Sequence, residues 1–192
     1  EIWHESFSLP DKGIWGDENG NIKSDFSEIS TWKLEYSNVV LHNEKDYAKT
    51  VTTSGGRFEV VDINGDVIWL SSSINIADFL SVDVRLNATE TGSNDNQEKK
   101  YLNAYYRLDD EEKKLFNTNS ENSGNWGSAI AEQKELIGKE LQIIVHMAND
   151  YAGDKVILDE IVVTAKEKPL ERIFPGDILI SEILFNPVSG GD

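Results

Sequence analysis

The segment Phe79-Leu80-Ser81-Val82-Asp83-Val84-Arg85-Leu86-Asn87-Ala88 contains the clearest structural signal in the chain. Its aliphatic side chains recur at every second position, at residues 80, 82, 84 and 86. Because neighbouring side chains of a β-strand point to opposite faces, a period of two predicts a strand with one buried face. The segment is therefore expected to be a central strand of the fold.

Other segments repeat this pattern between clusters of Gly, Asn, Asp and Ser. Further strands are predicted at residues 2–7, 31–36, 47–53, 57–63, 66–72, 100–108, 141–147 and 156–164. Gly55-Gly56 predicts a turn between strands, and Asn64-Gly65 is a strong hairpin signal. Residues 127–136 hint at a short helix. Many short strands with little helix predict an all-β fold, an antiparallel β-sandwich or jelly roll.

The pattern also predicts the core and the domain boundaries. A chain of 192 residues suits one domain and a fragment of another. We expect a sandwich over residues 1–165, a charged linker with prolines over 166–176, and the start of a second domain at 177–192. Eight aliphatic residues are expected to face the core of the sandwich: Leu34, Val82, Val84, Leu102, Ile143, Val145, Ile157 and Ile161.

The composition excludes several classes of site and partner. There is no cysteine, which excludes disulfides, thiolate metal sites and a cysteine nucleophile. There is no apolar run long enough for a membrane span, so no membrane insertion is expected. The formal net charge of -17 repels nucleic acid and favours divalent cations. A solvated acidic surface, as in proteins from saline settings, explains the same charge.

No pattern of catalytic residues stands out, so the chain is predicted not to be an enzyme. His4, His42 and His146 lie on separate segments without metal-ligand spacing. The sequence contains neither a Gly-x-Ser-x-Gly elbow nor a phosphate-binding glycine loop. A glycosidase needs two carboxylates at a defined separation, and nothing singles out such a pair among thirty-five acidic residues.

Aromatic residues supply the candidate binding site. Trp15, in Gly13-Ile14-Trp15-Gly16-Asp17, and Trp126, in Gly124-Asn125-Trp126-Gly127-Ser128, each lie among glycines. Such a tryptophan is either a plug beneath a loop or an exposed platform that stacks on a sugar ring. Tyr105 and Arg107 fall on one face of their predicted strand. We therefore expect Trp15, Trp126, Tyr105 and Arg107 to be candidate carbohydrate-binding residues.

Three motifs resemble galactose-binding-like jelly-roll domains, a class that includes many carbohydrate-binding modules. They are Glu5-Ser6-Phe7, the segment from Asp46-Tyr47-Ala48-Lys49 to Phe58-Glu59, and the closing Val156-Ile157-Leu158-Asp159-Glu160-Ile161-Val162-Val163-Thr164. The resemblance implies a structural Ca²⁺ held by Glu5 and Asp159, with Asp46 as a third ligand, because Ca²⁺ takes oxygen ligands. Ordinary surface carboxylates on strand edges are the alternative.

The last sixteen residues carry a second resemblance. Asp177-Ile-Leu-Ile-Ser-Glu-Ile-Leu-Phe-Asn-Pro187 reads as one strand closed by a turn. It resembles the opening strand of lamin-tail (immunoglobulin-like) domains, which occur in secreted and surface proteins of bacteria, including those of Bacteroidetes type. The resemblance implies an exported, extracellular or cell-surface protein with neighbouring domains in the same chain.

These observations together predict a non-catalytic carbohydrate-binding module of an exported multidomain bacterial protein, with a polysaccharide or surface glycan as its partner. Two alternatives stay open. The domain could be a structural or adhesive surface unit without a small ligand. It could also be an accessory domain of a secreted nuclease or phosphatase.

Overall fold

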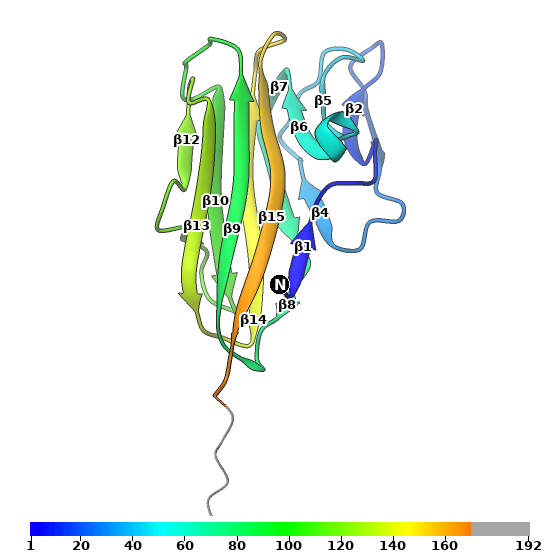
Figure 1. Ribbon diagram of the computed structural model, residues 1–192. Coiled ribbons are helices and arrows are strands. Elements are labelled where there is room, and N and C mark those ends of the chain that lie inside the picture. Colours follow the sequence, from blue (N-terminus) through cyan, green and yellow to red (C-terminus); the bar gives the residue numbers. More distant parts are fainter. Residues whose placement is uncertain (170–192) are drawn as a thin grey trace, which may run out of the picture.

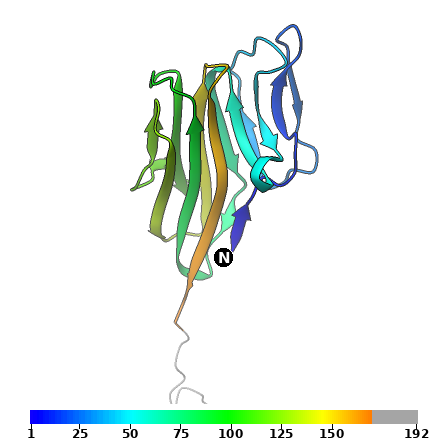
Figure 2. The same cartoon turned by 45° about the horizontal axis from the view of Figure 1, so that its top comes forward.

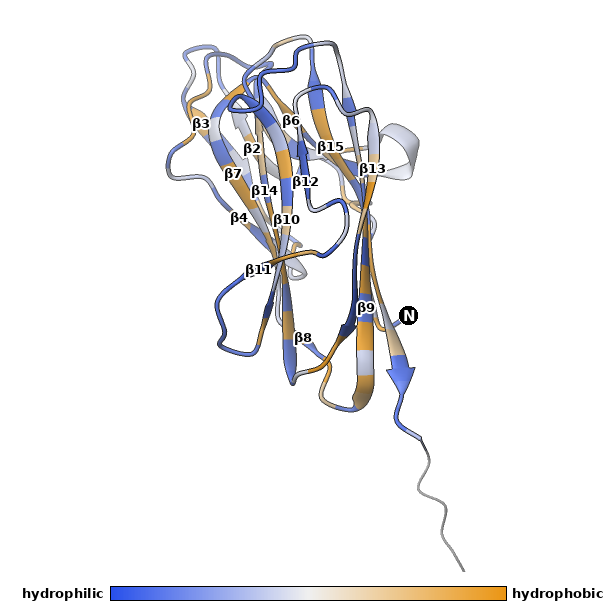
Figure 3. Cartoon of the chain, turned by 90° about the vertical axis from the view of Figure 1, so that its left-hand side faces the viewer, coloured by the Kyte–Doolittle hydropathy of each residue, from blue (hydrophilic) through white to orange (hydrophobic). Residues whose placement is uncertain are grey.

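The segment with the strongest alternation forms the long strand β9 (Phe79–Thr91) in the computed structural model, which describes residues 1–169. Its main partner is β15 (Lys155–Glu167), which runs antiparallel to it along almost its whole length. Hydrophobic and hydrophilic residues take turns along β9, as its orange and blue bands show (Figure 3). Val82, Val84 and Leu86 are buried and Arg85 between them is exposed, which confirms the one-sided pattern over these residues. Leu80, at the start of the strand, is 48% exposed and does not face the core.

The fold consists of two antiparallel sheets that pack face to face, and β9 and β15 belong to one of them (Figure 1). Sheet A has eight strands, in the order β13-β9-β15-β6-β5-β2-β3 with β1 beside β15. Sheet B has seven strands, in the order β11-β10-β14-β7-β4 with β12 beside β10 and β8 beside β14. The other strands of sheet A are β1 (Trp3–Glu5), β2 (Gly13–Gly16), β3 (Ile22–Asp25), β5 (Tyr47–Val51), β6 (Arg57–Val61) and β13 (Ser128–Leu136). Those of sheet B are β4 (Trp32–Glu35), β7 (Ile63–Ser71), β8 (Ile74–Asn75), β10 (Lys100–Leu108), β11 (Lys114–Leu115), β12 (Glu121–Ser123) and β14 (Glu140–Asn149).

The chain changes sheets at most of its connections. It crosses between the sheets at β3–β4, β4–β5, β6–β7, β8–β9, β9–β10, β12–β13, β13–β14 and β14–β15. The hairpin of β2 and β3, blue in Figure 2, extends sheet A to one side. The predicted antiparallel β-sandwich of jelly-roll type is therefore confirmed. Within residues 1–169 the helical content is one 3₁₀ turn, η1 (Thr53–Gly55), and no helix there is long and apolar enough to cross a membrane.

The hydrophobic core lies between the two sheets. Seven of the eight residues predicted to face it belong to the buried cluster. The exception is Ile157, which is buried but lies on the other face of β15, opposite Glu59 of β6. Its neighbours Val156 and Leu158 belong to the core cluster, so alternation places Ile157 on the outer face.

The predicted hairpin at Asn64-Gly65 is wrong. β6 belongs to sheet A and β7 to sheet B, and the chain turns between them at Asp62, whose φ of 50° is left-handed. Gly65 lies inside β7, where an added Cβ would fall 2.4 Å from the carbonyl oxygen of Asn38. Glycine is required there for close approach of two backbones. The turn predicted at Gly55-Gly56 is confirmed, because β5 and β6 pair antiparallel around it.

The short helix predicted over residues 127–136 is also wrong. Most of this segment forms β13, which pairs with β9 from Ser128 opposite Thr89 onward. Its Ala, Glu, Gln, Lys and Leu residues favour helix, but helix propensity is weak and tertiary pairing overrides it. At the other end of the chain, β15 continues to Glu167, two residues beyond the predicted domain end at 165. Residues 170–176 of the predicted linker and the whole 177–192 segment lie outside the described residues.

A buried ion cluster closes the end of the sandwich where β9 leads into β10. Lys100 is 0% exposed, and its Nζ lies 2.7 Å from Asp154 Oδ2 and also contacts Glu90 Oε2. The same ammonium donates to the carbonyl oxygens of Thr91, at 2.9 Å, and Asn94, at 3.4 Å. Burial by itself lowers the pKa of Lys100, but hydrogen bonds to the two carboxylates outweigh it, and the net pKa is raised.

Candidate functional site

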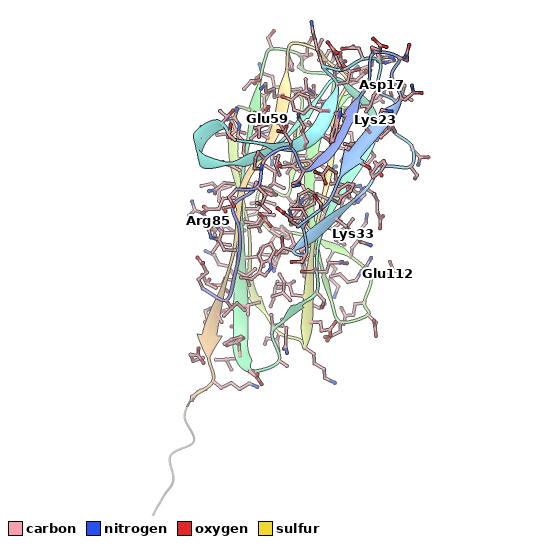
Figure 4. All side chains as sticks on the ribbon, turned by 90° about the vertical axis from the view of Figure 1, so that its right-hand side faces the viewer. Asp17, Lys23, Lys33, Glu59, Arg85 and Glu112 are labelled. Carbon is pink, nitrogen blue, oxygen red and sulfur yellow. The ribbon has the colours of Figure 1, made fainter. Side chains whose placement is uncertain are left out.

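The outer faces of the sandwich carry the side chains that alternate with the core. Figure 4 views the sandwich edge-on, with Lys33 and Glu112 on the side of sheet B and Glu59 and Arg85 on the side of sheet A. On β10, Leu102 and Ala104 are buried in the core. Tyr105 and Arg107 therefore share the outer face of sheet B, as their spacing predicts.

A cavity of about 190 Å³ lies on this outer face. Three aliphatic residues of the central strands line its floor: Ile68, Leu70 and Ile144. Leu70 and Ile144 are opposite each other in the β7–β14 pairing, which brings them side by side. Charged and polar side chains form the rim of the cavity: Lys33, Glu35, Arg107, Lys113, Gln142 and His146.

A second cavity of about 410 Å³ adjoins the first. Arg107 and Gln142 line both cavities, and Nη1 of Arg107 donates to Oε1 of Gln142 at 3.3 Å. The other residues of the second cavity are mostly acidic: Ser73, Asp109, Asp110, Glu111, Glu112, Glu140 and Leu141. The two cavities together are called the sheet B groove below. Residues of β4, β7, β10 and β14 line it.

A chain of hydrogen bonds holds the rim in place. Asp66 Oδ2 lies 2.6 Å from Nδ1 of His146, and Nε2 of His146 lies 2.7 Å from Nζ of Lys113. Because an ammonium has only donors, Nε2 accepts from Lys113 and Nδ1 carries the proton donated to Asp66. Lys113 Nζ also lies 4.6 Å from the ring centroid of Tyr105, whose ring meets the imidazole edge-on at 5.1 Å.

The two tyrosines of β10 on this outer face, Tyr101 and Tyr105, stay protonated. Burial raises the pKa of Tyr101, and the nearby Asp66 carboxylate raises it further. The Tyr101 hydroxyl donates to Asp66 Oδ1 at 3.2 Å. Burial also raises the pKa of Tyr105, with smaller contributions from Glu121 and Asp66. Both phenols are therefore neutral groups at and above physiological pH.

The two predicted tryptophans lie elsewhere. Trp15 is part of β2 in sheet A, on its outer face, where Lys49 Nζ lies 5.7 Å from its ring centroid. Trp126 precedes β13 and packs against the hydrophobic core, and its buried Nε1 has no hydrogen-bond partner within residues 1–169. Of the four candidate carbohydrate-binding residues, the structure brings together Tyr105 and Arg107 and separates both tryptophans from them.

The three predicted calcium ligands do not lie together. Glu5 of β1 is opposite Ile161, close along β15 to Asp159. Both oxygens of Glu5 already accept hydrogen bonds, from the Phe7 amide at 2.7 Å and from the Thr31 hydroxyl at 2.7 Å.

Asp46 lies at the far end of β6 from Glu5. Its neighbour Tyr47 pairs with Val61, whereas residues 6 and 7 approach Gly56 just before β6 begins. Five strand residues separate these ends, which is roughly 13–16 Å. Within residues 1–169 no group of three or more His, Cys, Asp or Glu is placed to hold a metal. The expected ligand set therefore does not form one site, and bound calcium stays a prediction.

Sequence reasoning missed His146, Asp66, Gln142 and Lys113. A signal for two of them exists, because residues 142 and 146 alternate on β14 with the core residues Leu141, Ile143 and Val145. Their meeting with Asp66 depends on the pairing of β14 with β7, which places His146 opposite Ile68. Local patterns do not specify that pairing.

Comparison with known proteins gives likeness of fold alone. No family model and no curated protein matches the chain. Among solved structures, the fold is similar to TmCBM61 in complex with β-1,4-galactotriose, with 10% identity, a TM-score of 0.46, and coverage of 74% of this chain and 91% of that one. It is also similar to the CBM22-1 xylan-binding domain from Paenibacillus barcinonensis, with 9% identity, a TM-score of 0.45, and coverage of 88% and 96%. A family 11 carbohydrate-binding module from Clostridium thermocellum, in complex with a β-1,3-1,4-mixed-linked tetrasaccharide, shares 13% identity at a TM-score of 0.40, with coverage of 82% and 99%.

Proposed function

We propose that the sheet B groove binds carbohydrate and that the protein is a non-catalytic carbohydrate-binding module. One observation carries this proposal. An apolar floor of Ile68, Leu70 and Ile144 lies inside a rim of polar side chains that hold one another in position. A sugar ring has the complementary surface, because its C–H groups form an apolar face and its hydroxyls surround that face. Sites for small ligands commonly combine an apolar lining with a few placed polar groups.

The rim offers the mixture of groups that sugar hydroxyls require. A hydroxyl both donates and accepts hydrogen bonds. Arg107 and Lys113 supply donors, Glu35 supplies acceptors, and the amide of Gln142 supplies both. Tyr105 lines neither cavity, but its amphipathic ring lies beside Lys113 and His146 of the rim. Because two cavities join at Arg107 and Gln142, the groove suits successive units of a polysaccharide better than a single enclosed sugar.

The wider setting is part of the same proposal. We propose that the module belongs to an exported multidomain bacterial protein that works outside the cell or at its surface. The resemblance of residues 177–187 to a lamin-tail strand supports this setting. In it, the module would bring neighbouring domains of the chain to a polysaccharide. A structural Ca²⁺ would stiffen the scaffold without taking part in recognition.

Affinity gel electrophoresis of the 192-residue protein against a panel of soluble polysaccharides tests the proposal. Tyr105→Ala and Arg107→Ala should abolish the retardation that the unmodified protein shows. Trp15→Ala changes the opposite sheet, and Lys45→Ala changes an exposed lysine at the edge of the 42–46 loop, so both should leave retardation unchanged.

Three outcomes would contradict the proposal or part of it. Loss of binding in Trp15→Ala alone would move the site to sheet A. No retardation by any glycan, with the protein folded, would favour a structural or adhesive domain. New reducing ends in the incubated polymer would contradict the non-catalytic part. Repeating the gel with EDTA and measuring the melting temperature separates a structural Ca²⁺ from a requirement for binding.

A further inference from the structure

Two cations at the sheet B groove have neutral partners. Arg107 donates to the amide oxygen of Gln142, and Lys113 donates to the imidazole of His146. Within residues 1–169 neither cation forms an ion pair with a carboxylate, although carboxylates outnumber lysines and arginines thirty-five to eighteen in the sequence. Both positive charges are therefore held in position without a direct ion pair, although Arg107 also lines the acidic larger cavity.

Most other lysines and arginines within residues 1–169 pair with a carboxylate; the exceptions are Lys45, Arg85, Lys139 and Lys168. Lys49 pairs with Asp11 at 2.7 Å, Lys99 pairs with Asp150 at 2.8 Å, and Lys155 pairs with the buried Glu59 at 2.7 Å. These pairs show that carboxylates are available to neutralise cations elsewhere in the chain. The smaller cavity has an excess of positive charge: its lining holds three cations and one carboxylate, Glu35, whose contact with Lys33 is 3.5 Å long.

The other end of the groove has the opposite charge. Four consecutive acidic residues, 109–112, line the larger cavity together with Glu140. Asp109 is fixed there by accepting hydrogen bonds from the amides of Lys139 and Glu140, both at 2.9 Å. A negatively charged sugar would be attracted to the smaller cavity and repelled from the larger one, because a cavity lined by one sign of charge concentrates ions of the other sign.

We infer that the groove recognises a glycan with an isolated carboxylate on an otherwise neutral chain, the carboxylate lying between Arg107 and Lys113 and neutral sugar units lying in the larger cavity. This inference rests on the proposed carbohydrate binding. Arginine suits the role, since its planar guanidinium matches a carboxylate and the pair forms a charge-assisted hydrogen bond. A chain with a carboxylate on every unit is disfavoured, because its next charge would meet residues 109–112.

The test compares three polymers by isothermal titration: glucuronoxylan, the same glucuronoxylan after reduction of its carboxylates to alcohols, and polygalacturonate. The first should bind most tightly. Reduction removes the charge and keeps the neutral chain, so affinity should fall about tenfold or more, as for loss of a hydrogen bond to a charged group. Polygalacturonate should bind at least as weakly as the reduced polymer. Raising the salt concentration should weaken binding of the first polymer and leave that of the reduced one nearly unchanged.

Substitutions locate the effect on the protein. Arg107→Gln and Lys113→Met should each weaken binding of glucuronoxylan about tenfold and bring it close to that of the reduced polymer. Lys45→Met, which removes an exposed lysine away from the groove, is the matched control and should change neither.

Equal affinity for glucuronoxylan and its reduced form would overturn the inference while leaving carbohydrate binding intact. Tight binding of polygalacturonate would overturn the restriction to an isolated charge. Absence of binding to these polymers and to the whole neutral panel would instead show that the proposed function itself is wrong.

Discussion

Replacing Lys100 with methionine removes the cation from a buried cluster that holds two carboxylates. Lys100 is 0% exposed, and its partners Glu90 and Asp154 are 5% and 3% exposed. Methionine fills a similar volume but cannot donate to either carboxylate or to the carbonyl of Thr91. The variant therefore keeps two negative charges out of water without the ammonium that compensates them.

The expected cost is about 3–5 kcal/mol of the free energy of unfolding, the range for removal of one partner from a buried ion pair. Total stabilities of single domains are about 5–15 kcal/mol, so the loss should be plain in a urea titration at pH 7. The neighbouring residue provides a matched control. Lys99 pairs with Asp150 at 2.8 Å but its side chain is 49% exposed, so Lys99→Met should cost less than about 1 kcal/mol.

The pH dependence of the difference gives a sharper test. In the unmodified protein, burial alone would raise the pKa of Asp154, but hydrogen bonds from Lys100 and Asn94 outweigh it and lower the pKa. Its contribution to stability is thus present above the unfolded pKa, about 3.9, and is lost as the pH falls through the lower folded value. In Lys100→Met, Asp154 stays buried but loses the hydrogen bond from Lys100, so its pKa rises relative to that in the unmodified protein. The penalty is then full at neutral pH and decreases as acid protonates the carboxylate.

The difference in stability between the two proteins should therefore shrink steadily from pH 7 to about pH 4. Urea titrations at several pH values measure it directly. The reasoning is refuted if Lys100→Met costs no more than Lys99→Met at pH 7, or if the difference grows on acidification.

Three further predictions concern stability. Gly92→Ala should lower the free energy of unfolding by about 2 kcal/mol or more, because φ is 91° and the new Cβ would fall 1.9 Å from Asp154 Oδ1. The control Gly153→Ala places its Cβ with nothing within 4 Å and should be nearly neutral. Equal melting temperatures for the two variants would contradict this. Trp126→Ala should lower the free energy of unfolding by about 2 kcal/mol, roughly half the cost for a fully buried tryptophan. The loss should be clearly larger than that for Trp15→Ala, because Trp126 packs against the core. Chemical denaturation of the two variants measures the difference. Hydrogen bonds, chiefly from Asn21, lower the pKa of Asp17 to about 2, so Asp17 stabilises the fold above its unfolded pKa and that contribution is lost as the pH falls towards 2. Asp17→Asn should flatten this acid limb in melting curves recorded from pH 5 to pH 2, and an unchanged limb would count against the assignment.

Alternation of apolar and polar residues predicted the strands reliably, whereas the glycines did not predict turns reliably. The one-sided pattern of β9 predicted a strand, and the same rule placed Tyr105 and Arg107 on one face. Asn64-Gly65 misled because glycine has two uses: it permits turns, and it lets two backbones approach closely. Gly65 serves the second use, and the sequence alone does not distinguish them.

The glycines around Trp15 likewise serve close approach of two backbones rather than a turn. An added Cβ on Gly13 would fall 2.2 Å from the carbonyl oxygen of Ala48, and one on Gly16 would fall 2.2 Å from that of Asn43. These glycines let β2 lie tightly against its neighbours, so the segment is a strand rather than the loop that its composition indicated. The polar rim of the groove was harder still to foresee, because Asp66 and His146 are 80 residues apart and meet only through sheet pairing.

The pairing of β1 with β15 has a mechanical consequence. The strands run antiparallel, with Trp3 opposite Val163 and Glu5 opposite Ile161, so the segments before β1 and after β15 leave the sandwich at the same end (Figure 1). A force that pulls Ile2 away from residue 168 therefore loads this short ladder one residue pair at a time, as a zipper opens, rather than shearing all its hydrogen bonds together. β1 has only three paired residues, so we expect it to detach before the much longer β9–β15 ladder opens.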